Sequence, residues 1–410
     1  MVDREREEEV VIREFEEERD VKVVGKLERN CEIGTKERVS IFTNLLSNHP
    51  FSRICFYPLR LILVAEVVES GEIVGVVRGC IKTIGSHSGS LFKIGCLLGL
   101  RVSPTFRRKG VGQKLVNSAE EWMLRNGAEY SFLATEKNNT ASTNLFSLKC
   151  HYLYLTSLHI FVHPTTSPLN HISTATSSRQ VKVQKLNISQ AISLYTRTLK
   201  HKDLYLTDMD LILKEKLSLG TWVTYYKEDG NWEVENETSN VPNSWIVFSV
   251  WNTCEACKLQ VRSKYKPFRV IINTTLNHAR EKIKMFPCLR IPNVSNSPSS
   301  SSRRRPFGFL FIYGLHGEGD NLGELMECAW RFTSRLGESM KDYCKVVITE
   351  LGFGDPLAKL VPQTPSMSCI DDLWYIKSLS SAAQSNENEE DDKVLLNGQV
   401  RNVFVDPRDF

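Results

Sequence analysis

The chain has 410 residues, of which 41% are apolar, 24% charged and 9% aromatic. This length exceeds one ordinary hydrophobic core and therefore predicts two or three folded domains. The formal net charge of +4, from 52 basic and 48 acidic residues, is too small to indicate nucleic-acid binding or attachment to an anionic membrane.

No stretch approaches 18 consecutive apolar residues, and the first residues are charged, so we expect neither a transmembrane helix nor a secretory signal. The 11 cysteines are interpreted as reduced thiols, which places the protein in the cytosol or nucleus. Cys254 and Cys257 form a lone C-x-x-C pair. Zinc needs two further ligands, and no paired Cys or His motif stands nearby, so no metal site is predicted.

Residues 10–165 alternate between strand and helix patterns. The expected elements, in order, are a strand at 10–15, a helix capped by Asp20, a hairpin of strands 61–68 and 73–81, a buried strand at 94–102, a helix from 111 to a Gly127 cap, a strand at 130–135, a short helix at 142–148 and a strand at 153–162. This order predicts an α/β protein in which helices pack on a mixed sheet.

The second half repeats this order. Its expected elements are a strand at 181–186, a helix at 191–195, strands at 221–227, 245–251 and 307–313, a helix at 323–337 and a strand at 346–350. The pattern favours an internal duplication, although two unrelated strand–helix units would also look alike. Ser/Thr/Pro-rich stretches at 164–179 and 292–306 are interpreted as linker or loop. The predicted division is 1–165, a linker at 166–179, a second domain at 180–378 and an acidic mobile tail at 379–410.

Between a predicted strand and a predicted helix stands the run Arg107-Arg108-Lys109-Gly110-Val111-Gly112. The first N–H groups of a helix have no intrahelical partner and carry the positive end of its dipole. Two glycines let a phosphate approach the backbone, and three basic side chains add charge-assisted hydrogen bonds. The run therefore predicts a phosphate-binding loop, with a solvated basic turn as the alternative.

Residues 100–112 resemble the acetyl-CoA motif of the GNAT superfamily, in which a strand leads to R/Q-x-x-G-x-G/A. Asn139-Thr140-Ala141-Ser142-Thr143-Asn144-Leu145-Phe146 resembles a second segment of that family, N-x-x-A/S-x-x-L-Y/F. The element order over about residues 9–163 is similar too. The run Val11-Ile12-Arg13-Glu14-Phe15 and the long second half resemble the plant HOOKLESS type of N-acetyltransferase within that superfamily.

The resemblance implies two tandem GNAT folds, the second degenerate, and acetyl-CoA as the cosubstrate. It implies transfer of acetyl to an amine, on a protein lysine or N-terminus, in plant growth regulation linked to auxin and ethylene, with the nucleus as the preferred location. The cosubstrate residues carried over are Arg107, Arg108, Lys109, Gly110, Val111, Gly112 and Gln113 for the pyrophosphate and Leu100, Val102, Asn139, Ser142 and Phe146 along the pantetheine arm. No direct contact with nucleic acid is implied.

The catalytic groups depart from the family pattern. Phe146 stands where many family members have the Tyr that acts as the catalytic acid. Cys96 stands near the position of the Glu that some members use as the catalytic base. Glu136, just past the predicted strand 130–135, is the alternative base, or else a solvated loop carboxylate. In the second half the loop 316–321 carries Glu318 and Asp320, which would repel a pyrophosphate. A non-catalytic GNAT-fold scaffold and an enzyme for small-molecule amines therefore remain alternatives.

Overall fold

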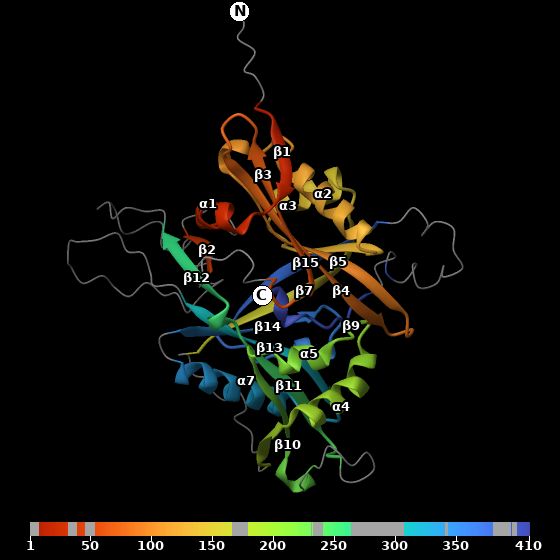
Figure 1. Cartoon of the computed structure of the whole chain (residues 1–410). Coiled ribbons are helices and arrows are strands. Elements are labelled where there is room, and N and C mark those ends of the chain that lie inside the picture. The colour runs from red at the N-terminus through yellow and green to blue at the C-terminus, as the bar shows by residue number, and fades with distance from the viewer. Residues whose placement is uncertain are drawn as a thin grey trace, which may run out of the picture.

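The computed structural model describes residues 8–31, 39–45, 54–165, 179–230, 232, 241–263, 307–340, 343–379, 395 and 400–410. The linker 166–178, the Ser-rich stretch 292–306 and the acidic run 387–392 lie outside these residues. One large sheet runs through the molecule in the order β1-β3-β4-β5-β6-β15-β7-β14-β13-β11-β10-β8 (Figure 1). Among the described helices, none is both long and apolar enough to cross a membrane.

The first half supplies one arm of this sheet and the helices packed on it. Its elements are β1 (Val10–Glu14), α1 (Glu17–Asn30), β2 (Val39–Leu45), β3 (Leu59–Val67), β4 (Ile73–Ser86), β5 (Leu91–Val102), α2 (Val111–Arg125), β6 (Tyr130–Glu136), α3 (Thr140–Asn144) and β7 (Leu153–Pro164). A π-helical turn, Leu145–Lys149, continues α3. These bounds confirm the hairpin and the strand–helix–strand order expected for residues 94–135.

The second half supplies the other arm. Its elements are β8 (Val181–Leu186), α4 (Ile188–Thr198), β9 (Leu204–Leu206), α5 (Met209–Lys214), β10 (Ser218–Tyr226), β11 (Trp245–Asn252), β12 (Cys257–Ser263), β13 (Gly308–Glu318), α7 (Leu322–Ser339), β14 (Cys344–Gly352) and β15 (Ser368–Ser378). β9 pairs with β4, and β12 pairs with β2 of the first half.

The strand order reads the same from both ends once β1, β3, β4, β5 and β6 are matched with β8, β10, β11, β13 and β14. Both halves also contain one parallel pair, β5 with β6 and β13 with β14. This confirms the predicted duplication of the fold. The last strands are exchanged: β15 of the second half lies between β6 and β7, and β7 of the first half lies beside β14. The expected boundaries near residues 165 and 179 therefore do not coincide with a break in the sheet.

Helices cover both faces of the sheet. On one face, α2 packs over the first arm and α7 over the second, each on its own cluster of buried apolar side chains. On the other face, a single larger cluster spans both halves beneath α1, α4, α5 and the C-terminal segment 400–410. The C-terminus consequently lies near the middle of the molecule, between the two arms (Figure 1).

Two expectations are corrected. Asp20 does not precede its helix; α1 begins at Glu17, and the fully buried Asp20 carboxylate accepts hydrogen bonds from Glu16 N at 2.9 Å and Arg13 Nη1 at 2.6 Å. The expectation of a mobile tail over residues 379–410 is wrong for the last residues of the chain, because Asp406 and Arg408 are only 2% and 3% exposed. Paired charges can be buried in this way when each finds its counter-ion and hydrogen bonds.

Candidate active site

The first half contains an opening between two strands. β5 and β6 pair in parallel only over Ile94–Cys96 and Tyr130–Phe132, and beyond these residues the two strands have no ladder between them. On its other side β5 bulges, since Gly99 and Leu100 both lie opposite the single residue Val77 of β4, and Gly99 has φ +61°. A bulge re-aims backbone groups that a regular ladder would occupy. Main-chain groups of β5 near Leu100 therefore lie beyond the end of the ladder between β5 and β6.

The N-terminus of α2 lies at the end of this opening. Gly110, in the left-handed conformation with φ +80°, precedes the helix, and the first helical hydrogen bond is donated by Lys114 N to Gly110 O at 3.0 Å. The N–H groups of Val111, Gly112 and Gln113 thus precede the helical ladder. The first turn of α2 carries no acidic residue. This is the geometry and charge that an anion requires.

The basic side chains before α2 are exposed, but two have internal contacts. Arg107 Nε donates to Val102 O at 3.1 Å, so the guanidinium is folded back on the end of β5. Lys109 Nζ lies 4.8 Å from the centre of the Phe106 ring. Arg108 adopts φ +67°, an uncommon conformation for a residue with a side chain. The bond to Val102 O uses one of the five N–H donors of Arg107, so its remaining N–H groups are not engaged by that carbonyl.

The second family segment is placed beside α2. Asn139 caps α3, where its Oδ1 accepts from Ser142 N at 3.2 Å, and Gln113 Nε2 donates to Lys149 O at 3.0 Å. Phe146 is 4% exposed and packs edge-on against Tyr152, with ring centres 5.5 Å apart. Its ring therefore supports the core under α2 and offers no proton, as the sequence already implied.

Cys96 lies on the opposite face of β5 from α2 and is 6% exposed. Its cross-strand partner is Cys80, and burial first, with the Cys96 thiol next, raises the pKa of Cys80 well above its ordinary value. Two neighbouring buried thiols behave as small apolar side chains and do not accept a proton from an amine. The arrangement does not favour Cys96 as a base.

Glu136 ends β6 on the same face of the sheet as Cys96. It is partly exposed, and burial raises the pKa of its carboxyl group. Directly opposite, on β15, lies Asp372, which sequence reasoning missed. Burial, followed by the Glu136 charge, raises the pKa of Asp372 to about 7. The structure therefore gives Glu136 an acidic neighbour contributed by the second half of the chain.

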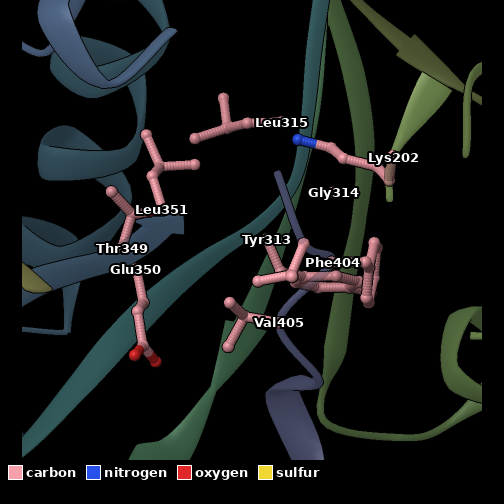
Figure 2. Close-up of a pocket in the computed structure, with 10 residues that line it drawn as sticks. Lys202, Tyr313, Gly314, Leu315, Thr349, Glu350, Leu351, Phe404 and Val405 are labelled. Carbon is pink, nitrogen blue, oxygen red and sulfur yellow. The ribbon is translucent and has the colours of Figure 1, made fainter. Parts of the chain in front are cut away.

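The corresponding opening in the second half is filled. β13 repeats the bulge, with Gly314 at φ +66° and with Gly314 and Leu315 opposite Phe248. Here the C-terminal segment packs against β13 and β14. A cavity of about 10 Å³ remains between them, which has room for no more than one water molecule. Figure 2 shows Phe404 and Val405 beside Tyr313 at this place. α7 also carries Glu324 in its first turn, so this helix end does not suit an anion.

Two solved acyltransferases share this architecture. A yeast N-myristoyltransferase solved with myristoyl-CoA and inhibitors superposes with a TM-score of 0.52 at 9% identity, covering 90% of this chain and 80% of the other. A GCN5-related glucosamine N-acetyltransferase region of a fungal multi-domain β-N-acetylglucosaminidase gives a TM-score of 0.50 at 13% identity, over 90% of this chain and 38% of the other. At such identities the likeness establishes the fold class alone.

Sequence relatives narrow the class to a family. The Acetyltransferase (GNAT) family model matches residues 35–152. The protein named probable N-acetyltransferase HLS1 of Arabidopsis thaliana is 36% identical over 98% of this chain and its own full length. Acetyl transferase GW6a of Oryza sativa subsp. japonica is 29% identical over 98% of this chain and 97% of its own. The chain belongs to the GNAT acetyltransferases of the plant HOOKLESS type and is an enzyme of the N-acetyltransferase class.

Proposed function

We propose that the first half of the chain binds acetyl-CoA and transfers its acetyl group to a primary amine on a protein, a lysine side chain or an N-terminus. The observation that carries the proposal is the N-terminus of α2, where three backbone N–H groups precede the helical ladder, exposed basic side chains stand just before the helix, and the first turn has no acidic residue. Arg107 to Gln113 hold the pyrophosphate, and main chain near Leu100 and Val102 aligns the pantetheine arm.

In this proposal the amine nitrogen attacks the thioester carbonyl, so that a C–N bond forms and the C–S bond breaks. Backbone N–H groups at the Gly99 bulge stabilise the negative charge that develops on the carbonyl oxygen. Glu136 accepts the proton lost by the amine, because a carboxyl group with a raised pKa is a stronger base than an ordinary one. Phe146 cannot return a proton to the leaving thiolate, so solvent supplies it.

Calorimetric titration of acetyl-CoA into the full chain tests the cosubstrate site. Gly110→Asp and Arg107→Glu place a negative charge at the end of α2, and we expect each to lower affinity at least tenfold. Arg125→Glu is the matched control for Arg107→Glu, since it makes the same charge change at the other end of α2. Equal affinity in all four proteins would exclude this loop as the phosphate site.

A second candidate function is that of a non-catalytic scaffold with the GNAT fold. Phe146 and the Cys80–Cys96 pair favour it, because neither position supplies the usual acid or base. Release of free CoA on mixing the full chain with acetyl-CoA and amine-bearing peptides separates the two functions. A nuclear location and a role in hormone-linked growth belong to the same proposal. They are supported by the sequence resemblance and are tested by imaging the tagged chain in plant cells.

A further inference from the structure

Three carboxylates lie along the line where the two halves exchange strands. Glu136 on β6 and Asp372 on β15 are direct cross-strand partners, and Glu350 lies two strands further on, on β14. Strand pairing places all three on the same face of the sheet, the face that carries Cys96 and the C-terminal segment. They run inward from the partly exposed Glu136 to Asp372 and Glu350, which are 7% and 5% exposed.

These carboxylates have no counter-ion within the described parts of the chain, where no ion pair joins any of them to a basic side chain. The Glu350 atom Oε1 is buried and receives no hydrogen bond from a described N–H or O–H group. Unpaired buried carboxylates are costly, so the arrangement needs a proton, a cation or both.

One proton can be placed. Glu350 and Asp372 lie within side-chain hydrogen-bonding reach, which two carboxyl groups can use only by sharing a proton. Burial first, and then the Asp372 charge, hold the pKa of Glu350 well above its ordinary value. Glu350 therefore keeps the proton and donates to Asp372. Asp372, with a pKa of about 7, is the group of the two that ionises first, beside Glu136.

We infer that Asp372 and Glu136 form the binding site for the acceptor as an alkylammonium ion, with Glu350 as a positioning residue that donates to Asp372. The inference rests on the proposed acetyltransferase function and adds the chemistry of the acceptor. An ammonium fits because it brings one positive charge and three N–H donors to a carboxylate pair beside the opening between β5 and β6. The side chain of Trp374 lies beside the Asp372 carboxyl group and lowers its pKa by a hydrogen bond.

A metal ion fits less well. Among the described residues, the groups close enough to share a metal are His159 with Cys369 and Asp371, and His201 with His316 and Glu318. Glu136, Asp372 and Glu350 do not form such a group.

The test measures acetyl transfer by the full chain at saturating acetyl-CoA, with two probes. Nα-acetyl-lysine methylamide presents a side-chain ammonium, and alanine methylamide presents an α-ammonium; the better substrate identifies the source of the amine. We expect Asp372→Asn to raise KM for that amine at least about tenfold, since a charge-assisted hydrogen bond is lost. The matched control is Asp371→Asn, whose side chain is bonded to Lys137 and His159 on the other face. It should leave KM within twofold.

Glu350 is tested by a pair of variants. Glu350→Gln keeps a hydrogen-bond donor to Asp372 and should preserve KM, whereas Glu350→Leu removes it and should move the pH dependence of KM to higher pH. A structural role alone would not produce that shift, because both variants have similar volume. Equal pH profiles for Gln and Leu, or an unchanged KM in Asp372→Asn, would overturn the inference.

Calorimetric binding of acetyl-CoA to each variant separates the two proposals. If the unmodified chain does not bind acetyl-CoA, the proposed function is refuted. If acetyl-CoA binds normally but Asp372→Asn leaves the KM for the amine unchanged, the ammonium site alone is refuted.

The unmodified chain also gives a test that needs no variant. Butylammonium chloride should raise its melting temperature more than equal concentrations of sodium chloride plus butanol, because a ligand of the folded state stabilises it. Equal melting temperatures would count against the site.

Discussion

Replacing Asp406 with asparagine should destabilise the whole chain, because this carboxylate joins the C-terminal segment to β4 of the first half and holds Arg408, which in turn bonds to Asp208 of the second half. Its oxygens accept from Lys82 Nζ of β4 at 3.1 Å and from Arg408 Nε and Nη2 at 2.9 Å each. Removing one partner of a buried ion pair costs about 3–5 kcal/mol. Lys82 would retain Asp409 at 2.7 Å and Arg408 would retain Asp208 at 2.7 Å, so we expect the lower end, about 3 kcal/mol.

Urea unfolding at pH 7, followed by tryptophan fluorescence, measures this loss. The control Asp210→Asn breaks an exposed pair with Lys214 and should change the free energy of unfolding by less than about 0.5 kcal/mol. Burial opposes ionisation of Asp406, but Lys82 and Arg408 together hold its pKa well below its ordinary value. Its stabilisation is therefore complete above about pH 4 and is lost as pH falls, so the two proteins should converge in acid. A loss below 1 kcal/mol at pH 7 would refute the reasoning.

Three further outcomes follow from the same structure. A fragment of residues 1–178 lacks β15, which separates β6 from β7, and should show no cooperative melt by circular dichroism; a melt like that of the full chain would mean that the exchange is dispensable. Gly110→Ala meets no atoms but must keep φ +80°, so it should cost about 1 kcal/mol, whereas the equally open Gly323→Ala in α7 should cost nothing. Because burial raises the pKa of Asp372, the folded state holds its proton more tightly and the free energy of unfolding should fall as pH rises from about 4 to 7, by roughly 1.4 kcal/mol per pH unit. Asp372→Asn should flatten that slope in urea midpoints, and parallel slopes would contradict the assignment.

The fold was largely predictable because its strands and helices carry clear hydrophobic periods. The run 94–102 became β5, and the helix expected after Gly110 became α2 with Gly127 at φ +79° beyond its end. The same pattern placed the glycine-rich loop between β5 and α2, and the binding of phosphate by that loop stays a prediction. Local sequence determines such features, and no long-range contact is needed to infer them.

The rest depended on contacts between distant segments. Asp371 and Asp372 make β15 look polar, yet the strand is buried between β6 and β7 because the exchange provides partners on both sides. The C-terminal charges likewise look solvated until Lys82 and Asp208 are placed beside them. The sequence repeat does point to two of the three carboxylates, because Thr135-Glu136 and Thr349-Glu350 occupy matching strands, β6 and β14. No local pattern indicates that Asp372 would lie between them.

The exchange of strands offers a physical reason for keeping a second copy whose helix α7 carries an acidic residue, Glu324, in its first turn. In the first half the equivalent of Glu350 is Glu136, at the open end of β6; in the second half the C-terminal segment covers the site and Glu350 becomes buried. Because the C-terminal segment fills the second opening, the buried Glu350 keeps its proton, whereas its counterpart Glu136 stays partly exposed. The strand that joins them, β15, belongs to the second half but completes the sheet of the first. In the proposed enzyme, neither half alone could assemble the acceptor site, which explains why a degenerate domain can remain essential to transfer.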